Sequence, residues 1–315
     1  IISLVAYLLD KRLGPKGEWE LFKGIYTPIV TPFNELEEID YSKMAHNLDR
    51  WGQTDLDGIV VLGTNGEFVY LGMEEKVELI KFVVKNFNPD KKVIAGTGCE
   101  STRDTIALCL EAAEAGAHAV LVLPPHYYKG SMNEEVLYSH YIEVADNSPV
   151  PVMLYNMPKN TGINLSVGLV ARLSQHPNIV GIKDTAGNIV QLAELVRDTV
   201  EGFSVFAGNA GYLLPALSIG AVGATVATAN ILPEMCCQVV KLFNDGKMEE
   251  AKALQQRLLE PNSMVTFKYG IPALKAAMDM LGYQGGIPRR PLKTLAVREK
   301  EMVRAALIRC GALQE

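Results

Sequence analysis

Cysteine and histidine are scarce in this chain of 315 residues, which has five of each. The cysteines form no C-x-x-C pair and the histidines form no H-x-x-x-H or H-E-x-x-H pattern, so we expect no metal site. An odd number of thiols is typical of a reducing compartment, and we expect the cytoplasm or, alternatively, the mitochondrial matrix. The residues are Cys99, Cys109, Cys236, Cys237, Cys310, His46, His118, His126, His140 and His176.

Long apolar runs and basic clusters are also lacking. Ile1–Leu9 is largely apolar, but its nine residues are far fewer than the roughly 20 that span a membrane. We treat residues 1–23 as an N-terminal extension, which is an accessory helix, a targeting remnant or an added tag. The net charge is −6 and no Lys/Arg cluster is interleaved with aromatic residues. We therefore expect neither a membrane nor a nucleic-acid partner.

The dinucleotide fingerprint G-x-G-x-x-G is missing as well, which argues against a doubly wound nucleotide-binding sheet. From Gly24 onward, eight buried strand patterns alternate with helical patterns. This alternation predicts an α/β fold, a (β/α)₈ TIM barrel over residues 24–232, followed by a C-terminal helical region over residues 233–315. The predicted strands are Ile25–Val30, Asp57–Gly63, Lys92–Thr97, Ala119–Leu123, Val150–Tyr155, Asn178–Asp184, Phe203–Ala207 and Val222–Ala227.

The sixth predicted strand ends in a lysine, Lys183, which is unusual for a strand that is apolar on both faces. One explanation is that the strand simply ends there, so that Lys183 reaches outward or pairs with Asp184. The other is that Lys183 points into a dry cavity. Desolvation would then lower its pKa from about 10.4 toward neutrality and free an amine to attack a carbonyl.

The ends of other strands carry further candidate residues, because barrel enzymes place their sites there. The turn Gly63–Glu67 follows strand two, and its backbone N–H groups could hold a carboxylate or phosphate, while the Thr64 hydroxyl could carry a proton. Tyr155 ends strand five beside strand six, so its phenol is a candidate proton donor near Lys183. A second glycine turn, Gly208–Gly211, follows strand seven, and its backbone N–H groups could also bind an anion.

Three kinds of function remain possible for such a barrel. A phosphate-binding barrel would need glycine turns after strands seven and eight, but strand eight continues into Ala227-Thr228-Ala229-Asn230. A non-enzymatic scaffold would be expected to lose the lysine or the tyrosine. A lysine with tyrosines and a threonine, without histidine or metal, best fits imine formation with a 2-oxo acid followed by C–C bond cleavage or formation.

Several of these stretches together resemble one family. They are Thr27-Pro28-Ile29-Val30-Thr31-Pro32-Phe33, Gly63-Thr64-Asn65-Gly66-Glu67, Tyr155-Asn156-Met157-Pro158 with Thr161-Gly162, and Gly181-Ile182-Lys183-Asp184. The chain resembles the dihydrodipicolinate synthase / N-acetylneuraminate lyase family of pyruvate-dependent class I aldolases over residues 24–315.

The resemblance implies roles for the candidate residues. Lys183 would form the Schiff base with pyruvate and Tyr155 would transfer protons near the imine, with no cofactor. Thr64 and Asn65 would bind the pyruvate carboxylate, and Thr64 would link Tyr155 to a tyrosine from a neighbouring subunit. That tyrosine is Tyr127 or, less favoured, Tyr128. Further substrate-binding residues would be Asn160, Gly208 and Thr225, and the family implies a homotetramer built as a dimer of dimers.

One departure from the family pattern bears on the substrate. Similar dihydrodipicolinate synthases carry an arginine where this chain has Asn160, and that arginine holds the carboxylate of aspartate semialdehyde. A neutral amide cannot replace the pair that a guanidinium forms with a carboxylate. Asn160 therefore argues against condensation with aspartate semialdehyde, unless Lys159 binds the carboxylate instead. Other stretches, including Gly98–Thr102, Leu173–Gly181 and Leu258–Asn262, look more like an aldolase that splits 4-hydroxy-2-oxoglutarate into pyruvate and glyoxylate. Dihydrodipicolinate synthesis and cleavage of a 2-oxo-3-deoxy sugar acid are the alternatives.

The helical region after the barrel has two lysines that could compete with Lys183. We expect Lys268 and Lys275 to lie on solvated faces or at subunit contacts. Cys236 and Cys237 open a helix of this region and are expected to pack in the core, because adjacent cysteines rarely form a disulfide in a relaxed helix.

Overall fold

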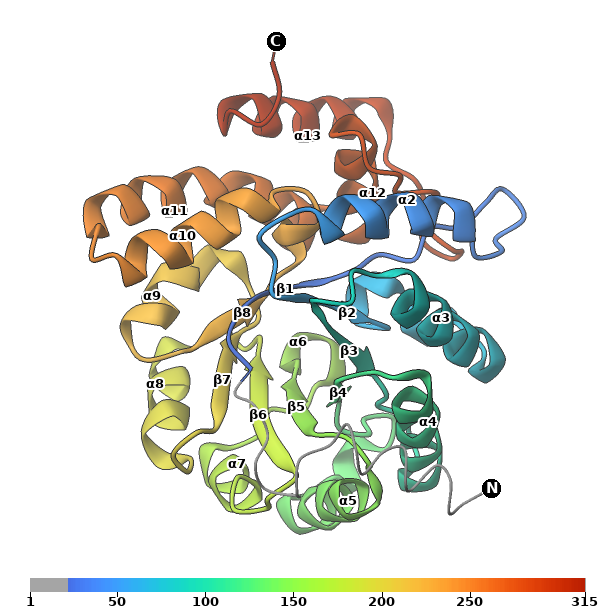
Figure 1. Ribbon diagram of the computed structural model, residues 1–315, viewed down its shortest axis with the longest axis vertical. Helices are drawn as coiled ribbons and strands as arrows, with labels where there is room; N and C mark the ends of the chain where they lie inside the picture. Colours follow the sequence, from blue (N-terminus) through green and yellow to red (C-terminus); the bar gives the residue numbers. More distant parts are fainter. Residues whose placement is uncertain (1–21, 315) are drawn as a thin grey trace.

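The computed structural model describes residues 22–314, and its eight parallel strands close into a barrel in the order β1 to β8 (Figure 1). The predicted TIM barrel is therefore confirmed. Gly24 of β1 lies opposite Gly223 of β8, and this pairing closes the sheet. The strands are β1 (Gly24–Pro28), β2 (Gly58–Val61), β3 (Lys92–Gly96), β4 (Ala119–Val122), β5 (Val152–Asn156), β6 (Ile179–Asp184), β7 (Ser204–Ala207) and β8 (Gly223–Thr225).

Helices cover the outside of the barrel, and five of those that follow the strands, α2, α4, α5, α7 and α8, begin at polar residues whose side chains cap them. Ser101, predicted as a cap, accepts the Asp104 N–H at 3.0 Å. Asn133 caps the next helix in the same way. The helices between the strands are α2 (Tyr41–Gly52), α3 (Met73–Asn86), α4 (Thr102–Ala115), α5 (Glu134–Asn147), α7 (Val167–Leu173), α8 (Ile189–Asp198) and α9 (Leu213–Ser218), and a short helix, α6 (Pro158–Thr161), follows β5. Within residues 22–314, no helix is both long enough and apolar enough to cross a membrane.

Side chains fill the inside of the barrel, because alternate residues of each strand point inward. This inner cluster includes Tyr26, Val60, Ile94, Leu121, Met153, Tyr155 and Phe206. A filled interior leaves the carboxyl ends of the strands as the place for a site.

The expected N-terminal extension, residues 1–23, lies outside the described residues except for its last two positions. Phe22 is buried, and its carbonyl oxygen accepts a hydrogen bond from the Ser204 hydroxyl at 2.9 Å. Its ring packs in the inner cluster beside Tyr26 and Phe206. The Phe22 side chain therefore belongs to the barrel interior.

The C-terminal helices gather on the side of the barrel formed by β8, β1 and α2 (Figure 1). They are α10 (Pro233–Asn244), α11 (Met248–Ser263), α12 (Ile271–Met280) and α13 (Val297–Arg309). A π-helical turn, η6 (Met264–Lys268), joins α11 to α12. This turn carries residues of the C-terminal region to the mouth of the barrel.

Helix α12 corrects one expectation from the sequence. Lys268 is exposed, as expected, but Lys275 is only 1% exposed. Helix α12 is packed on most of its surface, with Ala273, Leu274 and Ala277 also buried. An all-round apolar helix is buried, so a lysine within it is buried as well.

Burial also affects a histidine on the outer layer of the barrel. His140 of α5 is buried, and its Nδ1 lies 2.9 Å from the Thr102 hydroxyl. Because burial disfavours the charged ring, the pKa of His140 falls from 6.5 to about 4. Between these values the unfolded chain binds more protons than the folded chain, so acidification through this window lowers the free energy of unfolding.

We expect His140 to reduce the free energy of unfolding by about 2 kcal/mol between pH 7.5 and pH 5.0. In a His140→Gln variant this part of the pH dependence should disappear, because the amide does not titrate. Urea unfolding at the two pH values measures the difference, and His46→Gln, which alters an exposed histidine, is the control. An unchanged pH dependence in His140→Gln would contradict the prediction.

Candidate active site

A cavity of about 230 Å³ opens at the carboxyl ends of the strands and is closed on one side by η6. The residues predicted from the sequence that line it are Lys183, Tyr155, Thr64, Asn65, Asn160, Gly208 and Thr225. The lining also includes residues that the sequence analysis did not single out as site residues, namely Thr185, Val265, Thr266, Phe267, Gly270 and Ile271. A local sequence signal for residues 265–271 is absent, because the packing of the C-terminal helices brings them to the barrel.

Lys183 lies inside the cavity at the end of β6 and is 3% exposed. Tyr155 is its partner in the β5–β6 register, as predicted from their neighbouring strands. The Lys183 Nζ lies 4.3 Å from the centroid of the Tyr155 ring. The ring face attracts a cation, which offsets part of the desolvation of the amine. The alternative in which Lys183 reaches outward is therefore wrong.

Asp184 does not serve as the partner of Lys183, because successive strand residues point to opposite faces. Its carboxylate accepts hydrogen bonds from Asn156 Nδ2 at 2.7 Å, Gln191 Nε2 at 3.1 Å and the Ala186 N–H at 3.0 Å. Burial raises the pKa of Asp184, and these hydrogen bonds oppose the shift. The Asp184 carboxylate thus fixes the end of β6 on the face opposite the cavity, and the Lys183 amine faces the cavity.

Tyr155 and Thr64 are joined across the barrel mouth. The Tyr155 hydroxyl lies 3.1 Å from Thr64 Oγ1, and either group can donate the hydrogen. Tyr155 is 4% exposed, so its phenol meets the cavity rather than bulk water. A phenol beside an amine, with a second hydroxyl behind it, can pass a proton to or from a group bound at Lys183.

The glycine turn after β7 lines the cavity, but it does not offer the anion-binding N–H groups that we expected. The Gly208 N–H donates to the Asp184 carbonyl at 2.7 Å, and the Gly211 N–H donates to Asn209 Oδ1 at 2.8 Å. A Cβ at Gly208 would lie 2.1 Å from Thr185 Cγ2, so a side chain does not fit there. The turn serves close packing of β7 against β6, and Gly208 presents only its backbone to the cavity.

The outer rim of the cavity is formed by α6 and η6. Lys159 and Asn160 of α6 are exposed, and Lys159 Nζ lies 5.0 Å from the centroid of the Phe267 ring. Phe267 is 63% exposed, which is high for a large aromatic side chain. Lys159, which follows β5, therefore lies at the entrance of the cavity, whereas Thr64 follows β2.

The charges around the cavity favour an anionic ligand. Lys159 and Lys183 are the basic side chains among the lining residues, all of which lie in the described part of the chain, and none of these residues is an aspartate or glutamate. The nearby carboxylate of Glu67 forms an ion pair with Lys275, with 2.6 Å between Glu67 Oε1 and Lys275 Nζ. Over residues 22–314, no group of three or more His, Cys, Asp or Glu side chains is arranged to hold a metal ion.

Tyr127 is the predicted residue that the structure does not bring to this cavity. Tyr127 and Tyr128 are 77% and 73% exposed, and their rings contact each other at a centroid distance of 5.1 Å. Glu100 holds their loop by accepting the N–H groups of His126 and Tyr127 at 2.9 and 2.8 Å. Neither phenol lines the cavity of its own chain.

Fold and site together define a TIM barrel with a lysine-containing cavity at its strand ends, as in barrel enzymes that act on carbonyl compounds. The family comparison agrees with this class, because the profile of the dihydrodipicolinate synthetase family matches residues 21–309. The chain belongs to this family. The family and the enzyme class predicted from the sequence, a pyruvate-dependent lyase, are therefore confirmed.

Individual relatives carry two different names. The chain is 36% identical over 287 residues to a 4-hydroxy-tetrahydrodipicolinate synthase from Oceanobacillus iheyensis, covering 91% of this chain and 96% of that protein. It is 38% identical over 277 residues to a probable mitochondrial 4-hydroxy-2-oxoglutarate aldolase from Emericella nidulans, covering 86% and 89%.

Solved structures give the same fold. A dihydrodipicolinate synthase from Bacillus anthracis superposes with a TM-score of 0.88 at 32% identity, covering 93% of this chain and 99% of that one. A prophage protein of the dihydrodipicolinic acid synthase family from E. coli K12, solved in complex with pyruvate, also has a TM-score of 0.88, at 29% identity, covering 93% and 100%.

Proposed function

We propose that this protein is a Schiff-base-forming class I aldolase that cleaves a 4-hydroxy-2-oxo acid, best 4-hydroxy-2-oxoglutarate, to pyruvate and an aldehyde, glyoxylate. The observation that carries the covalent part is the buried Lys183 amine in the cavity, 4.3 Å from the Tyr155 ring. A lysine amine attacks carbonyl carbons readily when it is desolvated and neutral. The reaction needs no metal and no cofactor, since the amine itself forms the electron sink.

In the proposed reaction, the neutral Lys183 Nζ attacks the C2 carbonyl carbon of the substrate. Tyr155, linked to Thr64, supplies the proton with which the C2 oxygen leaves as water, and a C2=N iminium forms. The iminium accepts the electron pair of the C3–C4 bond while the Tyr155 phenolate takes the proton of the C4 hydroxyl, and glyoxylate is released. The remaining enamine takes this proton back at C3 from Tyr155, which regenerates an iminium. Water hydrolyses the iminium to pyruvate and frees Lys183, whose extra proton returns to the Tyr155 phenolate.

Two residues of α6 at the cavity entrance bear on how the second carboxylate of the substrate is bound. Asn160 stands where similar dihydrodipicolinate synthases have an arginine, and an amide binds a carboxylate less strongly than a guanidinium does. Lys159 is the charged side chain beside it on the cavity wall. Since Lys183 takes the C2 end of the substrate, we assign the second carboxylate of 4-hydroxy-2-oxoglutarate to Lys159. Thr64, Asn65 and Thr225 would contact the carboxylate next to C2.

Synthesis of 4-hydroxy-tetrahydrodipicolinate, from pyruvate and aspartate semialdehyde, is the second candidate. It is favoured by the name that the relative from Oceanobacillus iheyensis carries. Both reactions pass through the same pyruvate enamine, so only the aldehyde distinguishes them. Pyruvate release from 4-hydroxy-2-oxoglutarate, measured beside condensation of pyruvate with aspartate semialdehyde, tests the proposal. A kcat/KM that is higher for the condensation would overturn it.

Replacing Lys159 tests the substrate assignment within this proposal. We expect Lys159→Met to raise the KM for 4-hydroxy-2-oxoglutarate about two- to fivefold and to leave kcat within about 1.5-fold, because an exposed charge adds binding but no transition-state contact. A 4-hydroxy-2-oxo acid without the distal carboxylate should be cleaved equally well by both proteins. Lys268→Met, which removes an exposed lysine outside the cavity, is the control. Equal effects on both substrates would contradict the assignment.

Assembly and compartment belong to the same proposal. We expect a homotetramer built as a dimer of dimers, in which Tyr127 or Tyr128 meets the Thr64 hydroxyl of a neighbouring subunit. The exposure of both phenols supports such a contact. We expect the protein to act in the cytoplasm or in the mitochondrial matrix.

A further inference from the structure

A buried ion pair adjoins the turn that follows β2, which carries Thr64. Lys275 Nζ is 2.6 Å from Glu67 Oε1, and the two side chains are 2% and 0% exposed. Lys275 belongs to α12, whereas Glu67 follows the Thr64–Gly66 turn, so the pair joins the C-terminal helices to the barrel mouth. Neither residue takes part in the proposed chemistry. A buried pair contributes little net stability and often lowers it, which calls for another reason for its presence.

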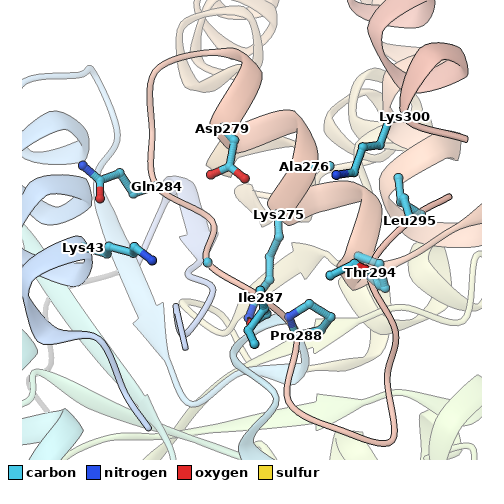
Figure 2. A pocket seen from close by; sticks show the side chains of 12 residues that line it. Lys43, Lys275, Ala276, Asp279, Gln284, Ile287, Pro288, Thr294, Leu295 and Lys300 are labelled. Atoms are coloured by element: carbon cyan, nitrogen blue, oxygen red, sulfur yellow. The ribbon is translucent and has the colours of Figure 1, made fainter. Parts of the chain in front are cut away.

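The remaining polar atoms of the pair are satisfied by backbone groups from other segments. Lys275 Nζ donates to the carbonyl oxygens of Thr31 at 2.8 Å and Ile287 at 2.7 Å. Glu67 Oε2 accepts the Arg289 N–H at 2.9 Å. Figure 2 shows the Lys275 side chain running from α12 toward Ile287, along the wall of a second cavity of about 270 Å³. The pair therefore fixes several separate segments relative to one another.

Arg289 adds a second attachment for the same loop. Its guanidinium donates to both oxygens of Glu75, at 2.9 and 2.7 Å, and to the Tyr70 carbonyl oxygen at 2.9 Å. Glu75 lies in the first turn of α3, which begins just after the loop. The residues between β2 and α3 are thus held at Glu67 and again at their far end.

The backbone of Glu67 shows that its position is enforced. Glu67 has a φ of 55°, in the left-handed region that a residue with a Cβ rarely adopts. This conformation costs about 1–2 kcal/mol, so surrounding contacts have to maintain it. The Glu67 N–H donates to the Thr64 carbonyl at 3.1 Å and thereby closes the turn. The same turn places the Thr64 hydroxyl 3.1 Å from Tyr155.

Burial disfavours the charged form of both Lys275 and Glu67. Burial lowers the pKa of Lys275 to about 8, with Glu67 opposing the shift, and burial raises the pKa of Glu67. Directional contacts of this kind trade stability for a fixed geometry.

We propose that Glu67 and Lys275 are positioning residues, which hold the Thr64–Asn65 turn in register with Tyr155. The inference rests on the proposed function for the role of Thr64. It assigns part of the active-site geometry to Lys275 of α12, which does not line the substrate cavity. Removing Lys275 should let the turn relax, so that Thr64 no longer meets the Tyr155 phenol.

A double-mutant cycle between Lys275→Met and Thr64→Val tests this directly. We expect Lys275→Met to lower kcat/KM for the aldol cleavage by about 10- to 100-fold, as misplacement of a catalytic group does. In the Thr64→Val background the same change should cost less than about threefold, because the group that it positions is already gone. Multiplied losses in the double variant would overturn the inference.

Hydrogen exchange gives a readout that does not depend on activity. The Gly66 and Glu67 amides, which donate within the turn, should exchange at least about tenfold faster in Lys275→Met. Arg309→Met, which removes the cation of the exposed Arg309–Glu260 pair, should change neither exchange nor kcat/KM. If Lys275→Met does not fold, Glu67→Gln enters the same cycle, since it keeps the shape and the acceptor for Arg289.

The two proposals fail in different ways. If the parent protein forms no borohydride-trapped pyruvate adduct, the proposed function falls, and the exchange rates still decide whether the pair holds the turn. If the parent forms the adduct and the turn exchanges at its parental rate in Lys275→Met, the positioning role alone is overturned.

Discussion

Replacing Lys183 with methionine should abolish aldol cleavage, with a loss in kcat on the order of 10⁵-fold or more. The change removes the amine that forms the imine and leaves an unbranched apolar side chain. Because Lys183 is buried over the Tyr155 ring, methionine can occupy the same space without exposing the core. The fold should therefore survive, and circular dichroism would check it beside the assay.

Trapping with borohydride locates the covalent step. Incubation with pyruvate and borohydride should leave a reduced pyruvyl group on Lys183, because hydride reduces the C2=N bond to a stable amine. Peptide mass mapping would identify the site. Lys159→Met should still form the adduct, since Lys159 is assigned only to binding. An adduct on another lysine, or none at all, would remove the basis for the aldolase mechanism and would favour a barrel with a binding role.

Replacing Tyr155 with phenylalanine should lower kcat by about 10²- to 10⁴-fold, the usual range for the loss of one positioned proton transfer. The ring remains, so the contact with Lys183 and the packing of the inner cluster should persist. The hydroxyl that meets Thr64 at 3.1 Å is lost. Steady-state kcat, together with the rate at which the borohydride-trapped adduct forms, measures the effect on each step.

A matched control separates the phenol of the site from phenols elsewhere. Tyr141 is buried in α5, and its hydroxyl donates to the Val122 carbonyl at 3.4 Å, away from the cavity. Tyr141→Phe should leave kcat within about twofold, because it removes a hydroxyl without touching the reacting groups. If Tyr155→Phe behaves like Tyr141→Phe, then Tyr155 is a packing residue and another group carries the protons.

The barrel could be predicted because its strands are buried on both faces. Parallel strands covered by helices appear as short continuous apolar runs, and each run here ends in polar or small residues. Lys183 was conspicuous because it interrupts such a run. Its relation to Tyr155 followed from the order of neighbouring strands, and the register confirms that the two residues are side by side.

The contacts made by the C-terminal region could not be predicted in the same way. Lys275 and Glu67 are far apart in the sequence, and neither position shows its partner locally. The apolar residues around Lys275, such as Leu274 and Met278, were a usable sign of burial. Phe267 gave no sign at all, because a π-helical turn has no sequence signature that would bring an exposed aromatic residue to the cavity.

Anion binding by the glycine turn after β7 could not be predicted from the sequence, because acceptors within the protein compete for its N–H groups. The Gly208–Gly211 stretch has the composition of an anion-binding turn, but its donors are used within the chain. Composition shows which backbone shapes are possible and does not show which acceptors lie nearby. At Gly208 the nearby acceptor is the carbonyl oxygen of Asp184 on the neighbouring strand β6. The Gly208 N–H donates to it and is therefore not free to bind an anion.

The two sides of the cavity differ in how freely they can evolve. Lys183, Tyr155 and Thr225 are less than 5% exposed, and changes there disturb a close-packed barrel. Lys159 and Asn160 are exposed on the short helix α6, where substitutions are tolerated with little effect on folding. Mutation and selection can therefore exchange one aldehyde for another at the rim while the lysine chemistry stays intact, so that related chains can share an inherited catalyst and still differ in metabolism.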